Sequence, residues 1–121
     1  MTKILHVYRT YFPDPQGGLQ EAIRQIALAS KAFGHEPRVF ALSPHPTPEH
    51  VECDGIAVWR ARSWAAPASC DLGGPKAFSA FAKAARWADV IHYHFPWPFA
   101  DVLESVVSPT RAKVMTYHSD V

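Results

Sequence analysis

The sequence lacks several features that would assign it to a class at once. It has 2 cysteines among 121 residues, without zinc-site spacing or the density of a disulfide-rich secreted domain, so both thiols are expected to be free. No hydrophobic run approaches the roughly 18 residues of a membrane span, and no signal-peptide segment follows Lys3. The 12 Lys and Arg residues are scattered among 11 Asp and Glu, and a net charge of +1 gives no footprint for nucleic acid. We therefore expect a cytoplasmic protein that binds no nucleic acid.

The hydrophobic segments that are present follow the pattern of an α/β fold. A length of 121 residues and a hydrophobic content of 48% fit one domain over residues 1–121. Short apolar runs alternate with helical patterns, and the five expected strands cover residues 4–8, 38–42, 55–59, 90–94 and 113–117. This alternation predicts a parallel, Rossmann-like sheet between two layers of helices, a three-layer αβα fold, with strand order 3-2-1-4-5.

Three helices are expected between these strands. The first carries an inward stripe at positions 19, 22, 23, 26, 27, 30 and 33, with Gln20 on the polar side, and Gly34 suits a left-handed helix end. The second starts at Pro75, after a long loop over residues 63–75. The third starts at Pro98 and has an apolar stripe that includes Val102.

The loop between the first strand and the first helix has a chemical interpretation. Gly17 and Gly18 stand where the helix begins, and the free N–H groups and the dipole at that end attract an anion such as a phosphate. The pair matches neither G-x-G-x-x-G nor the P-loop motif. From these residues alone, the alternative that the two glycines only turn the chain stays open.

Three segments are expected to meet at one end of the sheet. In the order 3-2-1-4-5 the first and fourth strands are neighbours, and ligands bind beyond their carboxyl ends. This places the loop after Arg9, the segment from His94 to Trp97, and His118 around one crevice. The imidazoles of His94 and His118 are expected to face the crevice and donate hydrogen bonds, or only to touch solvent at a strand end. Trp97 offers a sugar an apolar face or packs as a helix staple. Arg9 pairs with a phosphate or carboxylate, or forms a surface salt bridge.

Histidines in or next to the strands raise the question of a metal site. His92 and His94 share one strand face, but His6 and His92 are expected to lie deeper, as hydrogen-bonded core residues, and no acidic residue joins them. A metal site needs at least three ligands that meet at one point. No metal is therefore expected.

Three motifs together resemble a known family. Three segments, in this order, are similar to the start of the N-terminal Rossmann-like half of GT-B retaining glycosyltransferases of family 4: KILHVYRTYFPDPQGGLQEAIRQIA, ADVIHYHFP and KVMTYHSD. The resemblance covers essentially the whole chain. It implies a hexosyltransferase of two Rossmann-like domains, which moves a sugar from a nucleotide-sugar to a glycan or lipid-linked acceptor. The nucleotide-sugar is a substrate, and no cofactor is expected.

The resemblance also implies roles for single residues. Gly17 and Gly18 would contact the donor diphosphate, and His118 would contact the donor sugar near the reaction centre as the catalytic residue. Arg9, His94 and Trp97 would contact the acceptor. The implied setting is polysaccharide or lipopolysaccharide biosynthesis in the cytoplasm, with peripheral membrane association of the full-length enzyme.

The C-terminal donor domain of that family has no counterpart in this sequence, nor do the later strands of the N-terminal domain. The chain is therefore expected to be a truncated part of a longer enzyme. It is expected to be inactive alone, because half a cleft does not neutralise the departing phosphates. The strand over residues 113–117 would then be an edge strand, through which copies of the chain are expected to associate.

Two other functions fit the fold class. One is a small dinucleotide-binding domain, although its glycine fingerprint is missing and no acid ends the second strand to bind a ribose. The other is a non-catalytic, flavodoxin-like receiver or interaction domain, although the first strand leads into Tyr8 and Arg9 instead of an acidic cluster.

Overall fold

Strands and helices alternate along the part of the chain that the structure describes. The structure is a computed structural model that describes residues 2–9, 11, 18–43, 50–65, 72–73, 75–95, 97–107 and 112–117. The strands are β1 (Lys3–Val7), β2 (Glu36–Ser43), β3 (His50–Cys53), β4 (Ile56–Ala65), β5 (Leu72–Gly73), β6 (Val90–Phe95) and β7 (Ala112–Tyr117). The helices are α1 (Gly18–Ala32), α2 (Pro75–Trp87) and α3 (Pro98–Val107).

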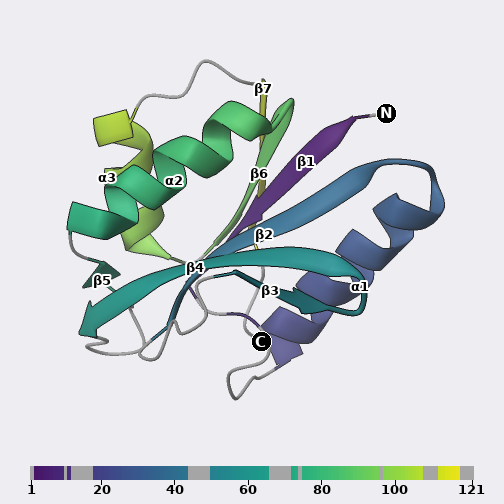
Figure 1. Cartoon of the computed structure of the whole chain (residues 1–121), viewed down its shortest axis with the longest axis horizontal. Helices are drawn as coiled ribbons and strands as arrows, with labels where there is room; N and C mark the ends of the chain where they lie inside the picture. The colour runs from purple at the N-terminus through teal and green to yellow at the C-terminus, as the bar shows by residue number, and fades with distance from the viewer. Residues whose placement is uncertain are drawn as a thin grey trace.

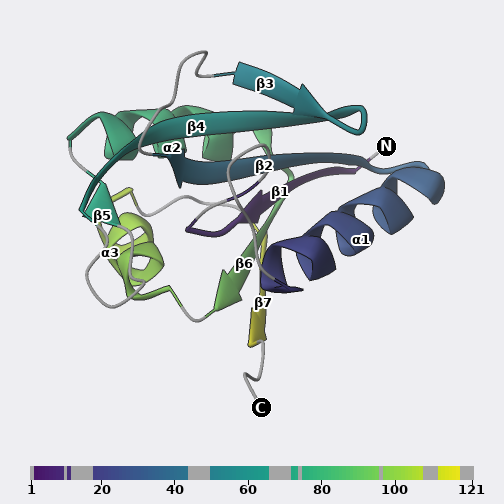
Figure 2. The same cartoon turned by 90° about the horizontal axis from the view of Figure 1, so that it is seen from below.

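One twisted sheet organises these elements (Figures 1 and 2). Its strand order is β3-β4-β2-β1-β6-β7, and β5 pairs with the end of β4. The five strands β4, β2, β1, β6 and β7 are parallel to their neighbours. They are the predicted third, second, first, fourth and fifth strands, so the predicted order 3-2-1-4-5 is confirmed.

The helices form a layer on each side of the sheet. Figures 1 and 2 show α1 on one face and α2 with α3 on the other, which confirms the predicted three-layer αβα arrangement. Aromatic rings join the sheet to the second layer: the Phe81 ring of α2 lies 5.5 Å from Phe40 of β2 and 6.3 Å from Tyr93 of β6. Phe78 and Phe99, with ring centroids 5.6 Å apart, connect α2 to α3. The burial of these large side chains stabilises the layers.

A hairpin at one edge departs from the all-parallel prediction. β3 pairs with β4 in an antiparallel register, and the two-residue turn between them is Asp54 and Gly55, with φ of 55° and 76°. Two positive φ angles in an Asp-Gly turn are typical of the type I′ hairpin. The turn is held to α1, because Arg24 Nε donates to Asp54 Oδ2 at 2.6 Å and Lys31 Nζ donates to the carbonyl of Gly55 at 2.9 Å.

The hairpin also shifts a predicted boundary. β4 continues to Ala65, where the sequence predicted a strand that ends at residue 59 and a loop that begins at residue 63. Pairing with both β2 and β3 supplies backbone partners along most of β4, and β5 pairs antiparallel near its end. Residues 66–71 and 74 of the predicted loop lie outside the described residues.

The predicted end of α1 agrees with the structure better than the predicted buried faces of the helices do. Gly34 has φ of 89°, and the N–H groups of His35 and Gly34 donate to the carbonyls of Ser30 and Lys31, as in a Schellman motif. Phe33, predicted to point inward, is 84% exposed because it follows Ala32, the last helical residue. Gln20, predicted on the polar face, is only 4% exposed. In α3, Val102 of the predicted apolar stripe is 44% exposed, whereas Phe99 and Leu103 are buried and Phe99 packs against Phe78 of α2.

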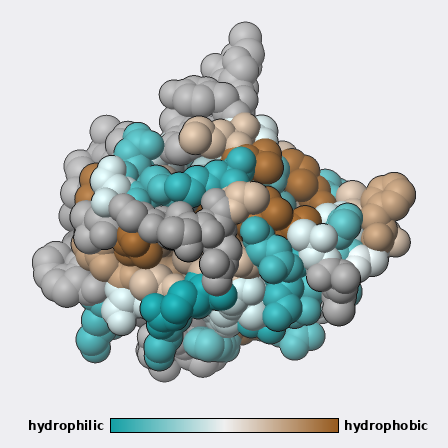
Figure 3. Space-filling view, turned by 90° about the horizontal axis from the view of Figure 1, so that it is seen from above, coloured by the Kyte–Doolittle hydropathy of each residue, from teal (hydrophilic) through white to brown (hydrophobic). Residues whose placement is uncertain are grey.

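The surface mixes polar and apolar groups. Figure 3 shows one side of the molecule, where hydrophilic residues (teal) lie among hydrophobic ones (brown). The large hydrophobic side chains that are most exposed are Phe33, Val102, Val114 and Met115. No helix in the described ranges has both the length and the apolar character that a membrane crossing requires.

Candidate functional site: the carboxyl end of β1 and β6

The candidate site lies where the winding of the sheet reverses. β1 and β6 are parallel neighbours, with His6 in register with His92 and Val7 with Tyr93. From β1 the chain returns through α1 to β2 on one side, whereas β6 leads through α3 to β7 on the other. In open α/β sheets this is the position where ligands bind, beyond the carboxyl ends of the strands.

Three histidines gather on one face of these two strands. Nδ1 of His6 lies 3.0 Å from Nε2 of His94, and both side chains are buried, with exposures of 1% and 0%. The rings of His92 and His94 are stacked, with centroids 4.2 Å apart. His92 Nε2 is hydrogen bonded to Thr116 Oγ1 of β7 at 2.6 Å. The cluster thus connects β1, β6 and β7 through side chains as well as through the backbone.

Burial keeps His6 neutral. Loss of hydration, and to a smaller extent the neighbouring His92, lower the pKa of His6 from 6.5 to about 3. A neutral imidazole offers one N–H donor and one acceptor, which suits a hydrogen bond with the ring of His94. The predicted core role of His6 is confirmed, whereas His92 is hydrogen bonded as predicted but only half-buried.

The three histidines lie close enough together to be compared with a metal site. One ring nitrogen from each of His6, His92 and His94 lies within 4.8 Å of the others, so three possible ligands do meet at one place. In a tetrahedral zinc site the nitrogens lie about 3.3 Å apart, and each lone pair lies in its ring plane. The stacked rings of His92 and His94, with planes 20° apart, do not aim at one point without rotation. The arrangement is that of a hydrogen-bonded network, and the absence of a metal stays a prediction.

Two predicted acceptor residues are more buried than expected. His94 does not face a crevice but lies fully inside the structure, because its ring is held between His6 and His92. Trp97 has an exposure of 0%, and its ring lies 5.7 Å from that of Phe99. Of the two interpretations of Trp97, a platform for a sugar or a helix staple, this packing favours the helix staple. Acceptor contacts by either residue stay predictions.

Arg9 occupies the expected position directly after β1. Its Nε donates to the Tyr8 hydroxyl at 3.3 Å, its guanidinium lies 5.6 Å from the centre of the Tyr8 ring, and its carbonyl accepts from the N–H of Leu42. The side chain is half-buried. These contacts hold Arg9 at the carboxyl end of the sheet, where a bound anion is expected.

The predicted donor residues are only partly described. Gly18 is the first residue of α1, as predicted, whereas Gly17 and His118 lie outside the described residues. Glu21, in the first turn of α1, is bound by Arg24 at 2.9 Å and Gln25 at 2.7 Å. The hydrogen bond from Gln25, and then that from Arg24, lower the pKa of Glu21.

One anchor of the first loop was missed by the sequence interpretation. Tyr11 is 1% exposed, and burial, followed by the nearby Cys53, raises its pKa from 10 to about 12. The Tyr11 side chain thus lies near α1 and the β3–β4 hairpin, where Arg24, Cys53 and Asp54 act on its pKa. Its position in a Pro-rich and Gly-rich loop gave no periodic signal that could have identified it.

Comparison with known proteins decides the family. A family model described as a glycosyl transferase 4-like domain matches residues 17–119, which is most of the chain. The chain belongs to this family. The matched range contains Gly17, Gly18, His94, Trp97 and His118 but not Arg9, and the family assignment sets aside the dinucleotide-binding and receiver alternatives. The resemblance to GT-B glycosyltransferases of family 4 is confirmed.

Named relatives of this glycosyl transferase 4-like domain are sugar transferases. The chain is 37% identical over 119 residues to a D-rhamnosyltransferase of Pseudomonas aeruginosa, with 98% of the chain and 31% of the relative covered. It is 34% identical over 119 residues to an O-antigen chain mannosyltransferase of Escherichia coli, with 98% of the chain and 32% of the relative covered. The chain thus spans about a third of the length of these relatives.

A solved structure shows the same fold. Sucrose-phosphate synthase from Thermosynechococcus elongatus matches with a TM-score of 0.64 and 18% identity, over 98% of this chain and 33% of that one. At this identity the likeness concerns the fold alone. It agrees with a Rossmann-like unit within a larger protein.

Proposed function

We propose that this chain forms the acceptor-side domain of a retaining glycosyltransferase, which moves a hexose from a nucleotide-sugar to a glycan or lipid-linked acceptor. The observation that carries the proposal is the family match over residues 17–119, on a sheet whose switch point lies between β1 and β6. The names of the two relatives support O-antigen or related polysaccharide assembly as the setting.

The start of α1 is the proposed contact for the donor diphosphate. The helix has 15 residues and begins at Gly18, and the N–H groups and the dipole at the start of a helix attract an anion. Glu21, in the first turn, accepts hydrogen bonds from Arg24 and Gln25. Without a Cβ, Gly17 and Gly18 would allow a phosphate to approach the backbone.

His118 is the proposed catalytic residue at the donor sugar. In retaining transfer, negative charge develops on the departing diphosphate, and hydrogen-bond donors fixed at that position stabilise it. Arg9, at the carboxyl end of β1, is the proposed polar contact for the acceptor. His94 and Trp97 would act mainly by holding the wall of the site, given their burial.

The proposed setting is the cytoplasm. The full-length enzyme would associate peripherally with a membrane when its acceptor is lipid-linked. No cofactor and no metal ion are required in this proposal, because fixed N–H groups and positive side chains would stabilise the leaving phosphate.

The test is steady-state kinetics of the full-length enzyme that contains this chain. Gly18→Val places a branched side chain at the start of α1, and we expect kcat/KM for the nucleotide-sugar to fall about tenfold or more. Gly34→Ala is the control, since it changes the other end of the same helix, where no atom lies within 4 Å of an added Cβ. Equal donor kinetics for Gly18→Val and the unchanged enzyme would contradict the phosphate role.

A further inference from the structure

A second, positively charged groove lies on the α2 face of the sheet, away from the candidate site. It has a volume of about 460 Å³ and is bordered by α2 on one side and by β3 and β4 on the other. β2 and β1 separate β4 from β6, so the groove and the switch point are about 14 Å apart across the sheet. The groove therefore does not belong to the site described above.

One stripe of α2 forms the first wall. Lys76, Ser79, Ala80 and Lys83 line the groove at helical positions i, i+3, i+4 and i+7. The two lysines are seven residues apart on the helix, which places their Cα atoms about 10 Å apart along one side. The Ser79 hydroxyl lies between them, and Ala80 leaves space above the sheet.

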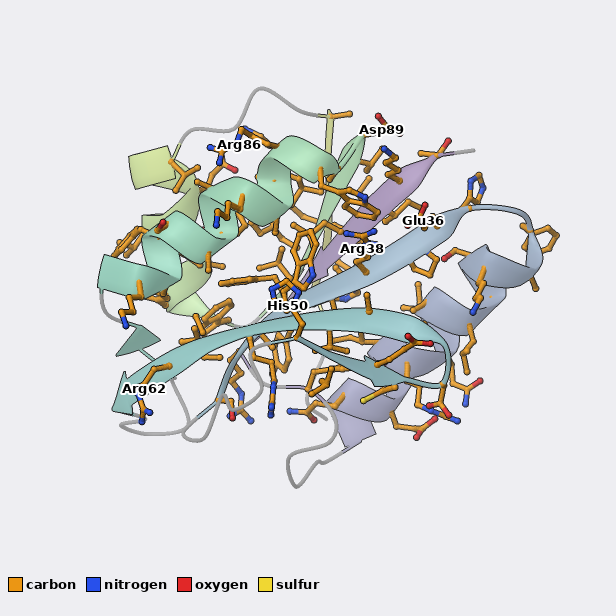
Figure 4. All side chains as sticks on the ribbon, in the orientation of Figure 1. Glu36, Arg38, His50, Arg62, Arg86 and Asp89 are labelled. Carbon is orange, nitrogen blue, oxygen red and sulfur yellow. The ribbon has the colours of Figure 1, made fainter. Side chains whose placement is uncertain are left out.

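The opposite wall is aromatic and held in place. His50 and Trp59 line it, with ring centroids 5.7 Å apart. Trp59 is fixed from behind by an edge contact with Trp87 at 5.9 Å and by the Arg38 guanidinium, 4.9 Å from its ring centre. Figure 4 shows Arg38 and His50 where β4 passes beneath α2. The wall thus offers an apolar surface and a ring N–H beside the two lysines.

The two lysines of the groove have no acidic partner among the described residues. None of the described lining residues is acidic, and α2 itself contains Lys76, Lys83 and Arg86 but no Asp or Glu. Lys76 and Lys83 are exposed and form no ion pair with any described residue, whereas Lys31 and Lys113 are bound by other groups. Two unpaired ammonium groups beside a hydroxyl and an aromatic surface are the contacts that a phosphate ester requires.

We infer that this groove binds the phosphate group of a phosphate ester, with Lys76 and Lys83 as the charged contacts and Ser79 as a hydroxyl donor. Trp59 would pack against the carbon atoms next to the phosphate. The same chemistry is present in a soluble phosphate ester and in the headgroup of an anionic lipid. The inference does not depend on sugar transfer, because it concerns binding alone.

The experiment has two arms. In the first, glycerol 3-phosphate is added to the chain and the amide resonances of α2 and β4 are followed. In the second, the chain is sedimented with vesicles of equimolar phosphatidylcholine and phosphatidylglycerol, or of phosphatidylcholine alone. Binding to glycerol 3-phosphate identifies the soluble ester as a ligand. Binding that requires phosphatidylglycerol identifies the lipid headgroup.

Lys76→Gln with Lys83→Gln is the test variant, and Lys31→Gln with Lys113→Gln is the control that removes the same charge elsewhere. We expect the test variant to weaken binding about tenfold or more and the control to weaken it less than about twofold. An unchanged far-ultraviolet circular dichroism spectrum shows that the test variant is folded. The inference is overturned if neither ligand binds, or if the control loses as much affinity as the test variant.

Discussion

Nδ1 of His6 and Nε2 of His94 lie 3.0 Å apart in a buried contact that joins β1 to β6 at the point where the winding of the sheet reverses. The two residues are 88 positions apart in the sequence. A hydrogen bond between two imidazoles in a low-dielectric interior is strong, and leaving either partner unsatisfied is costly. The pair therefore fixes the two strands whose carboxyl ends border the candidate site.

The first prediction concerns the stability of the chain in mild acid. The pKa of His6 is about 3 in the folded chain and 6.5 when exposed, so its contribution is present above pH 6.5 and is lost as the pH falls toward 3. The titratable side chains in contact with it are His92 and His94. We expect the free energy of unfolding, measured with urea, to fall by about 2 kcal/mol from this residue between about pH 7.5 and 5.

Two variants separate this effect from other histidines. His6→Asn keeps a donor near the position of Nδ1 but does not titrate, so the loss of stability in acid should become shallower. His50→Gln, which removes an exposed histidine of β3, is the matched control. If His6→Asn loses stability between pH 7.5 and 5 as steeply as the unchanged chain, His6 is not the group responsible.

The second prediction concerns the end of α1. Gly34 has φ of 89°, and an added Cβ would meet no atom within 4 Å, so only the backbone conformation opposes substitution. Gly34→Ala should lower the free energy of unfolding by about 1 kcal/mol, and Gly34→Asn should cost less, because asparagine tolerates this conformation. Thermal unfolding of both variants provides the measurement. Equal stability of Gly34→Ala and the unchanged chain would rule out the assigned helix end.

The third prediction concerns the attachment of α3. The hydroxyl of Tyr93 in β6 donates to Glu104 of α3, and Lys113 of β7 contacts the same carboxylate at 2.5 Å. Tyr93→Phe should lower the free energy of unfolding by about 1 kcal/mol. Burial, and then the bond to Glu104, raise the pKa of Tyr93, so this tyrosine stabilises the chain below pH 10 and loses that contribution above it.

Unfolding by urea at neutral and alkaline pH measures both the stability lost in Tyr93→Phe and the pH dependence that Tyr93 contributes. The loss of stability above about pH 10 should be smaller in Tyr93→Phe than in the unchanged chain. A double-mutant cycle with Glu104→Gln isolates the pair, and a coupling energy near zero would show that the contact does not hold α3.

The fourth prediction concerns self-association. In the described part of the chain β7 pairs with β6 alone, and its Val114 and Met115 side chains are 47% and 69% exposed. An uncovered, apolar edge strand favours pairing with another copy. Sedimentation at increasing concentration should show dimers or larger species, and Met115→Lys should shift them toward the monomer. A monomer at all concentrations would contradict this expectation.

The sequence predicted the parallel part of the fold because periodicity and breaking residues decide it. The starts of α2 and α3 at Pro75 and Pro98 and the turn at Gly34 follow from local chemistry. The strand order follows from the alternation of strands and helices and the topology rules for parallel sheets. The β3–β4 hairpin was missed, although Asp54 and Gly55 form a typical hairpin turn, because the residues before it, 50–53, are too few to give a clear strand pattern.

The candidate site was harder to predict because burial depends on distant partners. His94 stands at a strand end, and only the packing of His6 and His92 shows that it is enclosed. Trp97 next to two prolines fitted either a sugar platform or a helix staple, and only its burial beside Phe99 of α3 favours the staple. Gly18 at the helix start was predicted correctly because the signal is local.

The most direct test of the account is sugar transfer by the full-length enzyme that contains this chain, with His118→Ala compared with His50→Ala. We expect His118→Ala to lower kcat for transfer from the nucleotide-sugar by about a hundredfold or more, since it removes a donor to the developing charge, while His50→Ala keeps its rate. A His118→Ala enzyme that transfers sugar as fast as the unchanged enzyme would contradict the proposed function of this site.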